Sequence, residues 1–322
     1  MRMARIKIQD RAAVYHCVSR IVGGQRLLKD IYKEAFRKLM WQQAEFCGIQ
    51  ILTYCVMTNH VHILARIPEP TVIPDPVLIQ RAIALYGPRG NLVRLLREGL
   101  DRQGKIPDDL RQHLTERMGD VSVFMKELKQ RFSKYYNRQT GRFGTLWAER
   151  FKSVLVEDQP EALGNVAAYI DLNPVRATLA KDPKDYRWSG YGEAMGGNRK
   201  AREGVCLIEH QDTWRKAAAA YRKLLYLIGA VSGHSDKVAL DPKAIRKVLA
   251  QGGQLTEAQA LRVRIRYFTD GVVLGSEAFV NEIFAEFRDR FSKKRKTGAR
   301  KILHLPFPSL RTCRSLRVGV PG

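Results

Sequence analysis

The sequence predicts an α+β fold, an antiparallel sheet of the ferredoxin or RRM kind with helices packed on one side of it. Over the first 172 residues, segments with strand and helix patterns follow one another in the order strand, helix, strand, strand, helix, strand, helix. Only a short turn at Thr58 and Asn59 separates the two middle strands, so they are expected to be antiparallel neighbours. The chain has 322 residues, 45% of them hydrophobic, which is enough for a large core.

Short runs of β-branched and aromatic residues predict the strands, and apolar residues at helical spacing predict the helices. The strands are expected at residues 13–20, 49–57, 61–67 and 152–157. The helices are expected at 30–46, 121–137 and 160–172. The first helix stops at Gly48, and the last must end near Asn173 because Pro174 disfavours a helical conformation in the residue before it.

The charge balance points to a polyanion as partner. The chain has 56 Lys and Arg against 32 Asp and Glu, a net charge of +24. Five scattered cysteines, odd in number and without CxxC spacing, favour reduced thiols in a cytoplasmic protein. No apolar run approaches the roughly 18 residues needed to cross a bilayer, so no contact with a membrane is expected.

These patterns divide the chain into two predicted domains. Residues 1–198 form the α+β domain, interrupted by a helical insertion at about 70–119. Residues 199–322 form a basic, mainly helical accessory region that is expected to bind DNA, with a mobile tail from about 292. Helices in this region are expected at 211–229, 241–250, 256–268 and 276–291.

The first chemical signal is a pair of histidines at the start of a predicted strand. Because side chains alternate along a strand, His60 and His62 project from one face and Val61 from the other. Two such imidazoles can share a divalent cation, although a polar surface or a hydrogen-bonded pair has the same pattern. His16 falls on a neighbouring strand, where a packed or hydrogen-bonded histidine is expected.

The second signal is a tyrosine and an asparagine four residues apart at a helix end. This spacing places Tyr169 and Asn173 on one helix face. Tyr169 could supply a phenolic oxygen and Asn173 a neutral carbonyl oxygen. Taken alone, a tyrosine among apolar neighbours is more often a core residue.

Together, the two signals resemble those of a known family. The segment 57–64 (MTNHVHIL) is similar to the HUH motif. The segment 168–177 (AYIDLNPVRA) is similar to the tyrosine-bearing segment of single-tyrosine HUH transposases, and most similar to that of the REP-associated tyrosine transposases. Residues 14–20, 129–153 and 185–191 add further similarity, so that the resemblance covers about residues 4–195 without the insertion.

The resemblance implies an HUH nuclease core and assigns roles to the two motifs. His60, His62 and Asn173 would be ligands of Mg²⁺ or Mn²⁺, and Tyr169 would be the nucleophile. The substrate would be single-stranded DNA beside a hairpin, cleaved through a 5′-phosphotyrosine intermediate and then joined to another strand. Relatives act as monomers or as homodimers, and a nucleoid-associated location within the cytoplasm is expected.

Several basic and aromatic residues outside these motifs are candidates for holding DNA. They are Arg142, Trp147, Arg150, Lys152, Lys293, Lys294, Arg295 and Lys296. A solvated charged surface explains the same residues, and both interpretations stay open.

Two other functions would account for part of the sequence. A non-catalytic protein on the same fold could bind hairpin DNA or RNA. A zinc hydrolase of small substrates could also use the two histidines, but it would lack an acidic general base beside them and would leave the charge of +24 unexplained.

Overall fold

A computed structural model of the chain describes residues 5–230, 267–302 and 309–314. Four strands form the core of its sheet: β1 (Ala13–Arg20), β2 (Gln50–Val56), β3 (His60–Ile67) and β4 (Lys152–Val156). They lie in the order β2-β3-β1-β4, and all neighbouring pairs are antiparallel. With the helices between them, this is the βαββαβ order of the ferredoxin-like fold that the sequence predicts.

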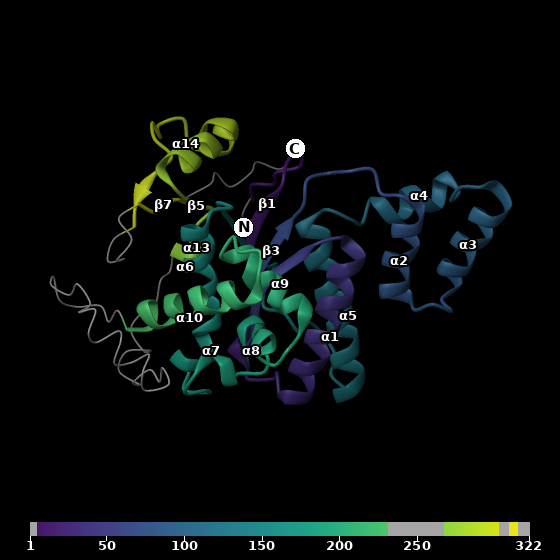
Figure 1. Cartoon of the computed structure of the whole chain (residues 1–322), viewed down its shortest axis with the longest axis horizontal. Helices are drawn as coiled ribbons and strands as arrows, with labels where there is room; N and C mark the ends of the chain where they lie inside the picture. The colour runs from purple at the N-terminus through teal and green to yellow at the C-terminus, as the bar shows by residue number, and fades with distance from the viewer. Residues whose placement is uncertain (1–4, 231–266, 303–308, 315–322) are drawn as a thin grey trace.

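Helices cover both faces of this sheet, whereas the sequence led us to expect helices on one side. One face is covered by α1 (Asp30–Cys47) and α5 (Val121–Thr140). The other face is covered by α6 (Pro160–Asp171), α9 (Arg199–Ile208) and α10 (Trp214–Ala230). Figure 1 shows the two layers on opposite sides of the strands. The second layer forms because β1, β3 and β4 bury apolar side chains on both faces, which requires cover on both.

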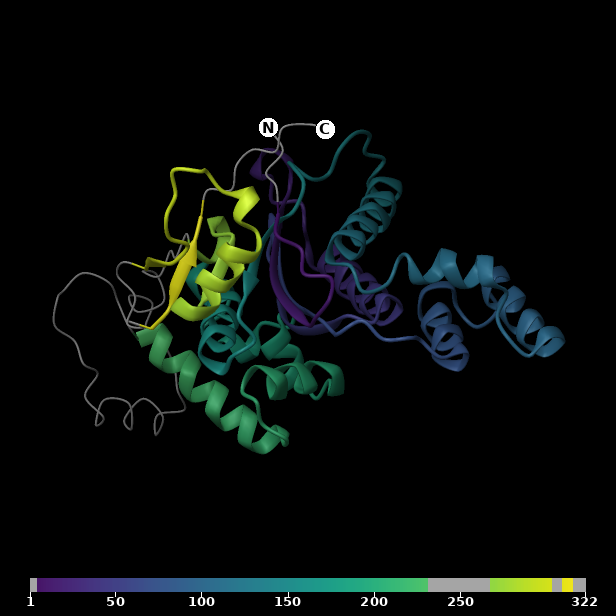
Figure 2. The ribbon, with the colours of Figure 1, turned by 90° about the horizontal axis from the view of Figure 1, so that it is seen from above.

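The short helices are α7 (Asn173–Arg176), α8 (Gly190–Met195) and three 3₁₀ turns at Val22–Gly24, Pro183–Asp185 and Arg288–Arg290. The insertion at 70–119 is helical as expected, with α2 (Asp75–Tyr86), α3 (Asn91–Gln103) and α4 (Asp108–Thr115). These three helices project from the body as a lobe (Figure 2).

The described part of the C-terminal region is mainly helical as predicted, and it also extends the sheet. Its described elements include α13 (Tyr267–Asp270) and α14 (Glu277–Glu286). Three short strands, which the sequence did not indicate, are β5 (Val273–Gly275), β6 (Arg300–Lys301) and β7 (Arg311–Cys313).

Strand β5 pairs in parallel with β4, and β7 and β6 follow it to complete a seven-stranded sheet. Strands β6 and β7 fall within the segment that we expected to be a mobile tail. The helix expected at 241–250 lies outside the described residues, as does the helix expected at 256–268 except for its last two residues. The division at residue 198 stays a prediction.

Candidate active site

The histidine motif lies at the start of β3, where the sequence placed it. Val61 packs into the core under α1 and α5, while His62 faces the layer of α6. His62 is opposite Val18 on β1, and His16 lies diagonally across from it on the same face. The ring centroids of His60 and His62 are 5.0 Å apart, and those of His16 and His62 are 5.1 Å apart.

Tyr169 brings its phenol ring against these histidines. Its ring centroid lies 5.7 Å from that of His62 and 6.1 Å from that of His16. Helix α6 ends at Asp171, next to the predicted boundary, so Tyr169 stands in the last turn of a helix packed on the sheet. Tyr169 and His60 are both half-buried, so the cluster has a side open to solvent.

The histidines of this cluster are neutral at ordinary pH. Burial lowers the pKa of His16 to about 4, which the hydrogen bond to the Phe268 carbonyl only partly offsets. Burial also lowers the pKa of His60 to about 4, and the positive charges of Arg20 and Arg176 act in the same direction. The pKa of His62 falls well below its usual range, because the ring is buried and has other imidazoles beside it. Neutral imidazoles keep the lone pairs that a metal ion requires.

Two arginines, which we did not assign to the site from the sequence, add positive charge beside Tyr169 and the histidines. The guanidinium carbon of Arg176 lies 4.4 Å from the centroid of the Tyr169 ring, and its Nη2 donates to the Tyr169 carbonyl oxygen. Burial lowers the pKa of Arg176 to about 10, so it stays charged at neutral pH. Arg20 is paired with His60 across β1 and β3. The seven-residue spacing from Tyr169 to Arg176, two helical turns, was the signal that could have revealed the first.

Asn173 is held by the backbone of the helix before it. Its Nδ2 donates to the carbonyl oxygens of Tyr169, at 3.0 Å, and of Ile170, at 3.3 Å. Within the described part of the chain, no hydrogen bond joins Asn173 to either histidine of the motif. The structure therefore brings His60, His62 and Tyr169 together, and it places Asn173 one turn beyond the tyrosine.

A buried carboxylate fixes the end of helix α6. Asp171 is fully buried and accepts hydrogen bonds from the Tyr221 hydroxyl at 2.6 Å, the Thr53 hydroxyl at 2.9 and 3.0 Å, and the Tyr191 amide at 3.1 Å. These donors come from α10, β2 and α8. Asp171 thus ties the helix that carries Tyr169 to three other elements, a role that we did not assign from the sequence.

The donors of the cluster fit a divalent cation in their chemistry. No group of three or more His, Cys, Asp or Glu side chains in residues 5–230, 267–302 and 309–314 is arranged to hold a metal ion. The expected ligand set is of another kind, because its third donor is the carboxamide oxygen of Asn173. Two neutral imidazoles and an amide oxygen suit Mn²⁺ and the other divalent ions that accept nitrogen ligands.

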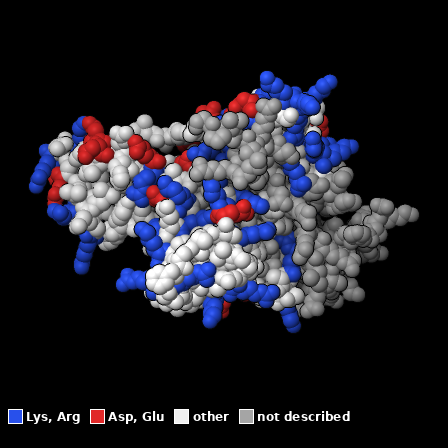
Figure 3. All heavy atoms as spheres, turned by 180° about the vertical axis from the view of Figure 1, so that it is seen from behind, with Lys and Arg blue, Asp and Glu red and all other residues white. Residues whose placement is uncertain are grey.

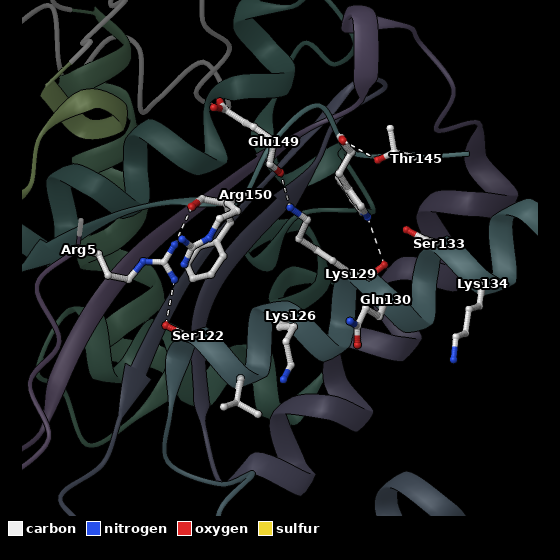
Figure 4. A pocket seen from close by; sticks show the side chains of 13 residues that line it. Arg5, Ser122, Lys126, Lys129, Gln130, Ser133, Lys134, Thr145, Glu149 and Arg150 are labelled. Carbon is white, nitrogen blue, oxygen red and sulfur yellow. Dashed lines mark hydrogen bonds between the residues drawn. The ribbon is translucent and has the colours of Figure 1, made fainter. Parts of the chain in front are cut away.

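A basic pocket of about 860 Å³ lies on the other face of the sheet, between α5 and the loop before β4. Figure 4 shows Lys126, Lys129 and Lys134 projecting from α5, with Arg150 and Arg5 across from them. Lys129 donates to the Glu149 carbonyl oxygen at 2.8 Å, and burial lowers its pKa to about 8. The pocket therefore offers several cations to an anionic ligand.

The loop that lines this pocket is connected directly to the histidine motif. Ile21, which follows β1, forms a bridge to Trp147, and its amide donates to the Asn59 carbonyl at 2.9 Å. The Ala148 amide donates to the Arg20 carbonyl at 3.0 Å. The pocket and the cluster thus flank the same end of β1, on opposite faces of the sheet.

The other residues that we expected to hold DNA are placed unevenly. Trp147 is only 7% exposed and packs on Phe36 and Phe132, so it offers little ring surface to a base. Phe143, in the same loop, is 95% exposed and was missed. Arg150 is exposed, Lys152 lies 3.6 Å from a Glu149 carboxylate oxygen, and Arg142 donates to Gln25 at 3.3 Å.

In the basic run after α14, three of the four residues are exposed. Lys293, Lys294 and Lys296 are open to solvent. Arg295 instead donates to the backbone carbonyls of Thr297, Gly298 and Arg314, which makes it a structural residue of this loop. On the face in Figure 3, Lys and Arg side chains prevail over acidic ones across the body and the C-terminal elements.

The chain is similar to known proteins in the part that carries the histidine motif. Residues 11–79, which include β1, α1, β2 and the histidine motif, match the family model described as "Transposase IS200 like". A protein of Haemophilus influenzae named "Putative REP-associated tyrosine transposase" is 26% identical over 176 residues, which cover 52% of this chain and 78% of the relative. These matches confirm the resemblance to IS200-like and REP-associated tyrosine transposases that the motifs indicated. The chain is similar to transposases of these two kinds.

One solved structure is also similar, although distantly. It is titled "Structure of the REP associates tyrosine transposase bound to a REP hairpin", and it is 16% identical with a TM-score of 0.39. The similarity covers 62% of this chain and 90% of that one. Within the described residues, no helix is both long and apolar enough to cross a bilayer.

Proposed function

We propose that this protein is a single-strand DNA endonuclease and strand transferase that uses Tyr169 as its nucleophile near a DNA hairpin. The observation that carries the proposal is the ring contact of Tyr169 with His62, which itself contacts His60, although Tyr169 and the histidine motif are far apart in the sequence. Both come from one chain, so the proposed chemistry needs no second copy, and a homodimer would add to it rather than complete it.

In the proposed reaction, the Tyr169 hydroxyl attacks a phosphodiester. A bond forms between Tyr169 Oη and phosphorus as the bond from phosphorus to the 3′ oxygen breaks. The phenol gives up its proton, and the departing 3′ oxygen takes one up. Rejoining is the reverse step with a different 3′ hydroxyl, and it needs no ATP because the phosphotyrosine keeps the energy of the broken bond.

The residues of the cluster have distinct parts in this step. Arg176, a cation over the Tyr169 ring, favours the phenolate form that attacks. His60, His62 and Asn173 would hold Mg²⁺ or Mn²⁺, which when bound would neutralise the phosphate and polarise its P–O bond. Arg20 and Arg176 add positive charge where the phosphate must approach.

DNA outside the reacting phosphate would be held by the basic surface. Lys126, Lys134 and Arg150 of the pocket, and the exposed Lys293, Lys294 and Lys296, are suited to backbone phosphates. The ring of Phe143 is exposed enough to stack on a DNA base. From the sequence, we expected Trp147 to have this role. The net charge of +24 supports a polyanionic partner for the whole surface.

The test uses labelled single-stranded oligonucleotides that carry the hairpins flanking this gene, incubated with the full chain and Mn²⁺ or Mg²⁺. We expect a protein–DNA band that resists denaturant. Tyr169→Phe and His60→Ala should each abolish the band, whereas Tyr135→Phe, a change in a half-buried tyrosine of α5, should retain it. Adducts that persist in Tyr169→Phe would overturn the assignment.

Binding without any adduct under either metal would favour the non-catalytic function instead. The same oligonucleotides as RNA would then show which nucleic acid is bound. A stable complex with hairpins of both kinds, at equal affinity and without cleavage, would identify a hairpin-binding protein on a nuclease fold.

A further inference from the structure

His16 connects the histidine motif to a distant part of the backbone. Its Nδ1 lies 2.7 Å from the carbonyl oxygen of Phe268, and its Nε2 lies 2.9 Å from Nδ1 of His62. All three residues are buried, with exposed fractions of 0% for His16, 2% for His62 and 1% for Phe268. Water therefore has little access to these hydrogen bonds.

The chemistry of this chain fixes where each proton lies. A carbonyl oxygen only accepts, so the proton of neutral His16 must be on Nδ1. Its Nε2 is then bare and can only accept, so His62 must donate from Nδ1. The single proton of neutral His62 is thereby used, and its Nε2 keeps a lone pair.

Asn59 does the same for His60. Its side-chain Nδ2 donates to the Gly24 carbonyl oxygen at 3.3 Å, which turns its Oδ1 away from that carbonyl. Oδ1 lies 2.7 Å from Nδ1 of His60. An amide oxygen only accepts, so the proton of His60 is on Nδ1 and its Nε2 is also bare.

We propose that His16 and Asn59 are positioning residues that lock His62 and His60 in the Nδ1–H tautomer, so that both present Nε2 lone pairs to the metal ion. Neither residue would touch the ion. That the two Nε2 lone pairs serve a metal ion rests on the proposed function. The tautomers of His60 and His62 do not, because they are a property of the metal-free chain. Hydrogen bonds of this kind to ligating histidines are typically worth 10- to 100-fold in metal affinity.

The first measurement is made without metal or DNA. The chain has seven histidines, so selective ¹⁵N labelling and long-range ¹H–¹⁵N correlation spectra can assign each ring. We expect His16, His60 and His62 all in the Nδ1–H form. The Nε2–H form at His62 or at His60 would overturn the proposal.

The second measurement is the affinity for Mn²⁺, the probe used with the full-length variants. His16→Phe keeps a ring of similar size but removes the acceptor, and it should return His62 to a mixture of tautomers and weaken Mn²⁺ binding by roughly 10- to 100-fold. His16→Gln, which can still accept, should recover part of the loss. Val14→Ala is the control, since it alters another buried side chain on the same face of β1 without touching the hydrogen bonds of His16. It should leave the tautomers and the affinity unchanged.

Asn59 gives an independent pair of variants at a half-exposed position, should His16→Phe fail to fold. Asn59→Ala should release the tautomer of His60 and weaken Mn²⁺ binding, and Asn59→Asp, which keeps an acceptor, should not release it. Unchanged tautomers and Mn²⁺ affinity in both His16→Phe and Asn59→Ala would overturn the proposal. If wild type shows the Nδ1–H forms but binds no Mn²⁺, the positioning is supported and the proposed metal site fails.

Discussion

Asp171, which supports the helix that carries Tyr169, has an electrostatic cost of burial. Its carboxylate is buried between α6, β2, α8 and α10, and burial raises its pKa from 3.8 to about 6 even though Tyr221, Tyr191 and Thr53 donate hydrogen bonds to it. The folded state therefore binds a proton that the unfolded state has already released between about pH 4 and pH 6. This contribution is present below pH 4 and is lost as the pH rises through 6.

The expected result for Asp171→Asn follows from that shift. A change of about two pH units corresponds to about 3 kcal/mol of folding free energy. Urea unfolding of wild type and variant at several pH values measures it. The stability of wild type minus that of the variant should fall by about 3 kcal/mol from pH 4 to pH 7. A difference that stays constant with pH would contradict the assigned shift.

At this scale, sequence reasoning was successful where the contacts are local. Alternation along a strand was enough to place His60 and His62 on one face, and four-residue spacing was enough to place Asn173 beyond Tyr169. Burial was not predictable in the same way. Trp147 and Arg295 look like their exposed neighbours in the sequence, and only the tertiary contacts show that one is in the core and the other binds backbone carbonyls.

Among the elements, strand β2 has an irregularity that determines how α9 packs. The register between β2 and β3 shifts between Ile51 and Thr53, which marks a bulge at Leu52. Gly204 of α9 lies against this point, and a Cβ atom there would be 2.4 Å from the Leu52 carbonyl oxygen and 2.7 Å from that of Ile51. Only glycine allows the helix to approach the strand so closely.

Gly204→Ala should therefore destabilise the protein by roughly 2 kcal/mol, the usual cost of forcing a methyl group into a filled core. Chemical denaturation gives the value. Gly196→Ala is the control, because Gly196 has φ −71° and its nearest contact for a Cβ is at 3.4 Å. It should stay within about 0.5 kcal/mol of wild type. Equal effects at the two positions would show that the close approach of α9 is unimportant.

The longer elements were predictable and the short strands were not. Strands β1 and β3 have eight residues each, enough for a recognisable pattern. Strands β5 and β7 have three each and β6 has two, too few for any period to show. The pairing of β5 with β4 depends on contacts across more than a hundred residues of sequence, and β7 and β6 join the sheet through β5. The sequence did not reveal that helices cover both faces, for a related reason. A strand buried on both faces lacks the alternation of apolar and polar residues by which a strand with one buried face is recognised.

For the molecule as a whole, positive charge should govern binding to DNA. Each phosphate contact adds roughly 1 to the slope of log affinity against log salt concentration. Lys126→Gln with Lys134→Gln, both in the basic pocket, should reduce that slope by about 2 and weaken binding to all sequences alike. The measurement is the affinity of the full chain for one oligonucleotide at several salt concentrations between about 50 and 200 mM. Salt in this range, of order 0.1 M, screens such contacts.

The control for this experiment lies in the insertion. Arg94 on α3 is exposed and pairs with Glu98 at 2.8 Å, in the lobe that projects from the body (Figure 2). Arg94→Gln should leave the slope unchanged. If it lowers the slope as much as the pocket variants do, the DNA lies across the insertion instead.

The contact between His16 and the carbonyl of Phe268 also has a consequence for biosynthesis. His16 leaves the ribosome before Phe268, which follows only after the whole α+β core, the insertion and α10 have been made. Domains fold from the N-terminus during synthesis, so the core can form early while His16 still lacks its partner. A nascent or prematurely terminated chain would then carry His60, His62 and Tyr169 with an unanchored His16. The proposed positioning of His62 would therefore be completed only after the segment around Phe268 has been made.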